Sequence, residues 1–222
     1  MELIRVDTQQ AYEQIRERII TLALVPGATM NPRALADELD VGLTAVQEAL
    51  KLLVHDDLVV VTPWHGLYVA DVTLADLEQI SETRLALEPL CARLAAQRAT
   101  ADDLAVLDAL CAAQKEIDAG DGRSLFNLDH KFHQAIAQAA HNQYLARTLD
   151  HFFGLSQRLW YLALPHLDFL PTAVDEHLNL VTAVRDKDAD RAAHMMHDHV
   201  QDFYDKVRQV LIKATTDRET NG

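Results

Sequence analysis

Four residues interrupt apolar helical stripes with groups that can bind a metal. They are one aspartate and three histidines: Asp129, His133, His177 and His199. Asp129 and His133 are four residues apart, a spacing that places both side chains on one face of a helix. The other two histidines fall in two further segments with apolar helical patterns. Three inward-facing helices would therefore bring one carboxylate and three imidazoles together.

A shared metal ion is one way to satisfy these four groups inside a protein core. A buried polar group without a partner costs on the order of 1–3 kcal/mol, and a charged one costs more. Neutral imidazoles with one carboxylate suit Zn, Ni, Mn or Fe(II) better than Ca or Mg, which prefer oxygen ligands. The pattern predicts a divalent transition-metal site without identifying the metal. The alternative is a set of separate core histidines, each hydrogen-bonded to a carbonyl or hydroxyl.

The composition fits a compact protein that could position such a site. The chain has 222 residues and is 49% hydrophobic, enough for one sizeable core or two smaller ones. No apolar run approaches the roughly 20 residues needed to span a bilayer, and the N-terminus has no signal-type pattern. We therefore expect a cytoplasmic protein with no membrane partner. Cys91 and Cys111 form no metal-finger spacing, and both are expected to be reduced core residues.

The first third of the chain predicts a helix and a second, shorter helix before a third one. Apolar residues recur at helical spacing from about residue 7 to the Pro26-Gly27 turn. A second helix is expected to begin after Asn31, a favoured N-cap residue that Pro32 follows in the first helical position. These short helices are typical of a helix-turn-helix unit.

The next segment predicts a reading helix and a wing. Thr44 and Gln47 fit a capping box at the start of a third helix, which would be the major-groove reader. Two β-rich runs at 58–61 and 67–70 predict a two-stranded wing. The N-terminal domain is therefore predicted to be a winged helix-turn-helix over residues 1–71.

The rest of the chain, residues 72–222, predicts helices only. It is nearly free of glycine and of β-branched runs, and its apolar residues follow helical spacing. The expected helices lie near 73–98, 101–118, 121–140, 142–164, 168–186 and 188–214. The predicted fold class is mostly α, with a winged helix-turn-helix followed by an all-α antiparallel helical bundle.

Short motifs follow one another in a specific order along nearly the whole chain. In the first domain they are Pro26-Gly27, Leu35-Ala36, Glu48-Ala49-Leu50 and Gly66-Leu67-Tyr68-Val69. In the second they are Arg84, Leu87-Glu88, Leu94-Ala95-Ala96, Asp129, Phe132-His133, Glu176-His177, Met196 and His199. In this order and spacing they resemble the GntR family of transcription regulators, in the FadR subfamily with a helical FCD ligand-binding domain.

The resemblance implies a function for each domain. It implies a homodimer that binds a palindromic operator on double-stranded DNA through residues 1–71. It also implies that residues 72–222 dimerise and bind a divalent metal together with a small carboxylate effector, which modulates operator binding. The family's metal-ligand positions match Asp129, His133, His177 and His199 one for one.

Two arginines are candidates for binding the effector. Arg84 corresponds to the family's arginine near the pocket and would clamp a carboxylate bidentately. The alternative for Arg84 is a surface arginine or one paired with Glu88. Arg158 is the second candidate. Four protein ligands would leave two positions on an octahedral metal for a carboxylate or water.

The predicted DNA contacts depart from the family pattern. The expected contact residues are Arg33, Thr44, Gln47, Lys51 and His65. The family's Ser-Arg pair and second arginine are replaced by Gly42, Leu43 and Gln47. Residues 1–71 hold five basic groups against eleven acidic ones, a net charge of −6, within a chain of net charge −14. Both features reduce the counterion-release affinity on which DNA binding depends.

Three hypotheses follow from these observations. The first is a ligand-responsive regulator whose DNA binding is weak and salt-sensitive. The second is a family member whose winged domain has lost DNA binding and which acts as a metal-dependent small-acid binding protein. The third is a metal-dependent enzyme acting on a small acid, since a bound metal can polarise a carbonyl or activate water. No general base stands at a recognisable spacing, so we expect that the chain is not an enzyme.

Overall fold

The computed structural model describes residues 2–64, 66–118, 121–163 and 170–220. The chain forms two compact units. The first contains residues 1–73 together with 157–162, and the second contains residues 74–156 and 163–222. Among the described helices, none is both long enough and apolar enough to cross a membrane. Cys91 and Cys111 are free and buried, as predicted.

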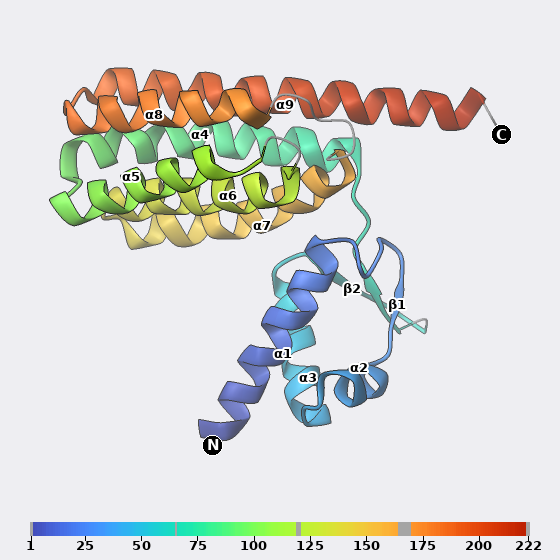
Figure 1. Cartoon of the computed structure of the whole chain (residues 1–222). Coiled ribbons are helices and arrows are strands. Elements are labelled where there is room, and N and C mark those ends of the chain that lie inside the picture. Colours follow the sequence, from blue (N-terminus) through green and yellow to red (C-terminus); the bar gives the residue numbers. More distant parts are fainter. Residues whose placement is uncertain (1, 65, 119–120, 164–169, 221–222) are drawn as a thin grey trace. The chain divides into compact units, whose positions relative to one another are not determined.

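Where the structure describes them, residues 2–73 of the first unit form three helices and a small sheet (Figure 1). Its elements are α1 (Glu2–Ile20), β1 (Thr29–Met30), α2 (Pro32–Leu39), α3 (Leu43–His55), β2 (Val59–Thr62) and β3 (Gly66–Val69). Helix α1 packs against α3 through fully buried side chains such as Ile15 and Ile19 on one helix and Val46 and Leu53 on the other. This apolar contact holds α3 with its opposite face exposed to solvent.

The sheet has one strand more than predicted. The strand order is β1-β3-β2, and both pairings are antiparallel, with Tyr68 opposite Thr29 on one side and Val60 on the other. The predicted two-stranded wing is confirmed as the β2–β3 pair, and β1 is an additional strand that was not predicted. The two residues of β1 are too few to show alternation, and they form a strand because β3 offers a free edge.

The start of α3 also differs from the prediction. Helix α3 begins at Leu43, and its N-cap is Gly42, which makes no side-chain cap hydrogen bond. The predicted capping box of Thr44 and Gln47 was wrong, because both residues lie inside the helix on its exposed face. The cap of α2 was predicted correctly: Asn31 Oδ1 accepts from the backbone nitrogens of Arg33 and Ala34 at 2.9 and 3.3 Å.

Helices make up the described part of the second unit, although residues 157–162 of the helix at 143–163 belong to the first unit (Figure 1). The helices are α4 (Leu74–Arg98), α5 (Ala101–Glu116), α6 (Gly122–Ala139), α7 (Gln143–Ala163), α8 (Leu170–Arg185) and α9 (Ala189–Thr220). Helix α4 packs against α6, α8 and α9, and α5 packs against α6 and α8. The mostly α fold class is confirmed. This arrangement brings α6, α8 and α9, which carry the predicted metal ligands, around one core.

Candidate metal centre and DNA-reading face

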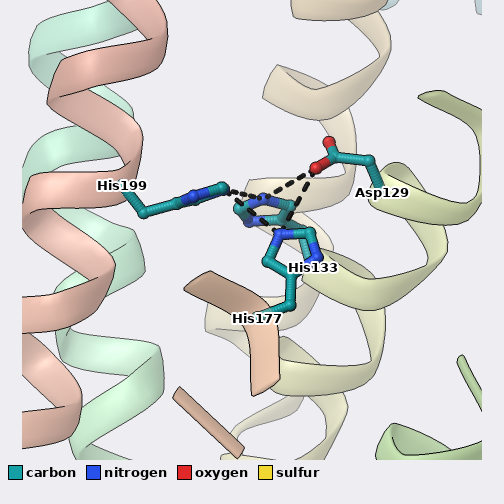
Figure 2. A group of neighbouring side chains, drawn as sticks. All are labelled: Asp129, His133, His177 and His199. Carbon is teal, nitrogen blue, oxygen red and sulfur yellow. Dashed lines mark hydrogen bonds and ion pairs between the residues drawn. The ribbon is translucent and has the colours of Figure 1, made fainter. Parts of the chain in front are cut away.

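The four predicted metal ligands converge in the helical unit. Asp129 and His133 project from α6, His177 from α8 and His199 from α9, and their side chains point toward one another (Figure 2). One ligand atom from each residue lies within 4.8 Å of all the others, and all four residues are buried. The aspartate and the three histidines, which interrupt the apolar stripes of three helices, therefore lie together in the core.

The distances between the ligand atoms suit one shared ion. His199 Nε2 lies 3.1 Å from His133 Nε2 and 3.3 Å from His177 Nε2. Asp129 Oδ1 lies 3.4 Å from His177 Nε2 and 3.8 Å from His133 Nε2. Ligands held at about 2.1 Å from one ion lie roughly 3.0–3.5 Å apart at right or tetrahedral angles. Three of the four distances fall in this range, and one transition-metal ion would fit if the Asp129 carboxylate moved closer to the imidazoles.

Each histidine has an acceptor on its other ring nitrogen. His133 Nδ1 lies 2.5 Å from Glu88 Oε2, and His199 Nδ1 lies 2.6 Å from Glu176 Oε2. An ionised carboxylate can only accept, so Nδ1 carries the proton in both rings.

The third histidine follows the same pattern. His177 Nδ1 lies 3.0 Å from the side-chain oxygen of Gln114, so this ring also donates from Nδ1. Burial and then its neighbours His199 and His133 lower the pKa of His177 well below its ordinary value, which keeps the ring neutral. With neutral rings that donate from Nδ1, the three Nε2 lone pairs and a carboxylate oxygen would face one another. Such a set of acceptors is repulsive unless a cation lies between them.

A buried ion pair lies beside this cluster. Arg84 on α4 donates from Nε to Glu88 Oε1, four residues along the same helix, and both residues are buried. Burial by itself would raise the pKa of Glu88, but Arg84 and His133 outweigh it and lower the pKa to about 2. Burial likewise opposes the charge of Arg84, and Glu88 outweighs it and raises the pKa of the guanidinium. Both groups are therefore charged at neutral pH.

Arg84 lies between two aromatic rings. Its Cζ is 5.1 Å from the centroid of Phe153 on α7 and 5.8 Å from the centroid of Tyr204 on α9. The structure thus places Arg84 in the core, which excludes the surface alternative and bears out the pairing with Glu88. Arg158 is also buried, and it donates to the backbone oxygen of Ala70. Its predicted role in effector binding stays a prediction.

The predicted DNA contacts lie on the exposed face of the winged unit. Thr44, Gln47 and Lys51 follow one another along the solvent side of α3. A groove of about 530 Å³ runs between α3 and the wing, and Gln47, Lys51, Val61 and Leu67 contribute to its lining. The predicted DNA-contacting face therefore combines the amide of Gln47 and the ammonium of Lys51 with the apolar side chains of Val61 and Leu67.

The cations of this face differ in their surroundings. Lys51 Nζ lies 2.7 Å from Glu48 on the same helix, and both side chains are at least half exposed. Arg33 is exposed and forms no ion pair with any residue that the structure describes. His65 lies outside the described residues. The structure thus leaves Arg33 available for a phosphate, whereas Lys51 already has an anionic partner.

Two family descriptions cover most of the sequence. Residues 79–202 match the family described as "FCD domain", which is more than half of the chain. Residues 7–69 match "Bacterial regulatory proteins, gntR family". The chain belongs to the GntR family of DNA-binding transcription regulators. It carries an FCD domain behind the winged helix-turn-helix, an arrangement consistent with the FadR-type subfamily.

Individual relatives agree with this assignment. The HTH-type transcriptional repressor RspR of Escherichia coli is 27% identical over 91% of this chain and 89% of its own length. The HTH-type transcriptional regulator McbR of Escherichia coli is 28% identical over 87% of this chain and 89% of its own length. The solved structure of E. coli McbR/YncC superposes with a TM-score of 0.82 at 24% identity, covering 91% of this chain and 97% of that one. The matched proteins are regulators rather than enzymes, as predicted.

The sequence of this GntR-family chain predicted the four members of the cluster but not the groups that orient them. Glu88 was considered as a partner of Arg84, Glu176 appeared only within the Glu176-His177 motif, and Gln114 was not singled out. A signal existed for Gln114, because it extends the buried stripe of Leu107 and Cys111 on α5. Glu176 precedes His177 along the chain but contacts His199, so its role depends on how α8 meets α9.

Proposed function

We propose that this GntR-family regulator binds a divalent transition metal at Asp129, His133, His177 and His199. The observation that carries the proposal is the convergence, in a buried place, of three imidazole Nε2 atoms and one carboxylate oxygen, each of which can bind a metal. The three Nδ1 partners fix each ring with its Nε2 lone pair toward the others. Zn, Ni, Mn and Fe(II) all suit this set of ligands.

We further propose that a small carboxylate is the effector. A metal held by four protein groups keeps open positions at which a carboxylate oxygen can bind. Arg84 supports this role, because its guanidinium is buried, charged and held beside the cluster by Glu88. The terminal nitrogens of an arginine suit bidentate recognition of a carboxylate. Binding there would change the affinity of residues 1–71 for DNA.

The DNA-bound form would be a homodimer on a palindromic operator. Two winged units related by a two-fold axis read two half-sites, which compensates for weak contacts in each unit. Weak contacts are expected, because the winged domain has a net charge of −6 and Lys51 is paired with Glu48. We therefore expect operator binding that falls steeply with salt.

The experiment that tests regulation is a selection of genomic DNA fragments by the purified, metal-loaded protein at low and moderate salt. One enriched palindrome that survives moderate salt, and from which a small carboxylate releases or stabilises the protein, would support the proposal. No enrichment at either salt concentration, from a folded dimer with metal bound, would contradict operator binding and leave metal binding as the remaining proposed activity.

A further inference from the structure

Glu88 contacts two functional groups with one carboxylate. Its Oε1 accepts from Arg84 Nε, and its Oε2 lies 2.5 Å from His133 Nδ1. The side chain is 2% exposed, so solvent does not compete for either oxygen. Through Glu88, the arginine on α4 and the proposed metal ligand on α6 are held in one hydrogen-bonded unit.

The other two histidine partners lack this double contact. Gln114 on α5 meets His177, and Glu176 on α8 meets His199, and neither is hydrogen-bonded to Arg84 in the described structure. Gln114 is as buried as Glu88 and orients a histidine of the same cluster. It therefore serves as a matched comparison: it supports the proposed metal without touching the proposed effector clamp.

We infer that Glu88 is a positioning residue that couples the metal to the effector carboxylate, by holding His133 and Arg84 in a fixed relation to each other. This inference rests on the proposed function. If one effector carboxylate binds both the metal and Arg84, the metal and the guanidinium must lie at a distance that the carboxylate can span. Because Glu88 fixes both groups, it determines how strongly the bound metal and the bound effector increase each other's affinity.

The chemistry of the side chain explains why a carboxylate is needed. Both carboxylate oxygens accept, so Glu88 can receive the His133 Nδ1 proton and the Arg84 Nε proton together. A glutamine offers one oxygen and one NH₂ group. If its oxygen faces His133, its NH₂ group meets the Arg84 N–H, and two donors repel. If its oxygen faces Arg84, its NH₂ group faces His133 Nδ1 and favours the ring tautomer whose Nε2 is protonated and cannot bind a metal.

The test measures Co²⁺ affinity of the metal-stripped, full-length protein with and without excess acetate. In the wild-type protein we expect acetate to raise Co²⁺ affinity. Glu88→Gln should lower Co²⁺ affinity by about 10- to 100-fold, the usual range for a group that orients a ligand, and should abolish the acetate effect. Gln114→Leu should lower Co²⁺ affinity over a similar range while the acetate effect persists. Glu88→Asp should restore part of that effect.

Two measurements separate the possible failures. An acetate effect of wild-type size in Glu88→Gln would overturn the inference while leaving the metal site intact. Absence of stoichiometric Co²⁺ binding by the wild-type protein would overturn the proposed function and this inference with it. In ¹⁵N-histidine NMR spectra of the metal-free protein, we expect His133 to be protonated at Nδ1 in the wild type and to shift toward the other tautomer in Glu88→Gln. A wild-type His133 protonated at Nε2 instead of Nδ1 would also overturn the inference, because Glu88 would then not hold that ring.

Discussion

The helical unit and the winged unit present their functional groups in opposite ways. In the helical unit, the cluster and the groups that orient it come from five helices and are mostly buried, as for Glu88, His133 and His177. In the winged unit, Arg33, Gln47 and Lys51 lie on the surface. Burial and hydrogen bonds hold the first set in place, whereas the second set is open to solvent.

This difference predicts how each unit responds to change. Removing one member of the buried cluster leaves the others without a compensating partner, which costs far more than a single contact. Removing one surface cation changes binding by one screened interaction.

Replacing His177 should have the largest effect. This ring is 1% exposed and stacks on Phe132 at 3.9 Å between centroids, so no water can take its place easily. His177→Ala should reduce metal affinity by more than about 100-fold, because it removes a ligand rather than a group that orients one. Isothermal titration with Ni²⁺ measures this loss. His194→Ala, an exposed histidine on α9, is the control, and a similar loss in both variants would argue against the cluster.

Metal removal should destabilise the helical unit. A ligand that binds only the folded state at 100 times its dissociation constant stabilises it by about 2.7 kcal/mol. For a domain of this size we expect the calorimetric Tm to fall by roughly 5–10 °C when a chelator removes the metal. The His177→Ala variant should show no such difference. A wild-type Tm that does not respond to added metal would contradict a stabilising site.

Arg33→Ala should weaken DNA binding by several-fold and to the same extent on all sequences. The side chain is available for a phosphate, and loss of one phosphate contact reduces the slope of log affinity against log salt by about 1. Fluorescence anisotropy with operator and unrelated duplexes at several salt concentrations measures both the loss of affinity and the change in the salt slope. Arg191→Ala, in the helical unit, is the control. If Arg33→Ala leaves the affinity and salt slope as they were, Arg33 does not contact DNA.

Glu48→Gln should have the smallest effect, and in the opposite direction. The change removes one acidic group from the recognition helix and releases Lys51 Nζ, now 2.7 Å from Glu48. Because exposed ion pairs contribute about 0.2–1 kcal/mol, operator affinity should rise by only about 2- to 5-fold. Weaker binding would instead show that Glu48 itself contacts the DNA, for example by accepting from a cytosine amine.

The same contrast between the units explains how much the sequence could predict. The six helices of the second unit and the four cluster residues follow from apolar periodicity, because a polar residue in a buried stripe stands out along the chain. The partners that orient the histidines are 45, 63 and 23 residues away from them in sequence. No local pattern pairs such distant residues, so these contacts required the packing of the helices.

In the winged unit, the misses have a different cause. Strand β1 depends on an edge that β3 supplies, and the start of α3 depends on the turn at Gly42 rather than on a capping side chain. Competing local signals are nearly equal in energy at such places, so tertiary contacts decide between them. The Asn31 cap, by contrast, is a strong local signal and was predicted correctly.

The most direct test of the central claim is a titration of metal-stripped protein with Ni²⁺, compared with a variant in which Asp129, His133, His177 and His199 are all replaced by alanine. We predict one tightly bound ion per chain in the wild-type protein and none in the variant, with the helical content of the two proteins equal by circular dichroism. Absence of tight binding in the wild type, or equal binding in a folded variant, would contradict the assignment of this cluster as a metal site.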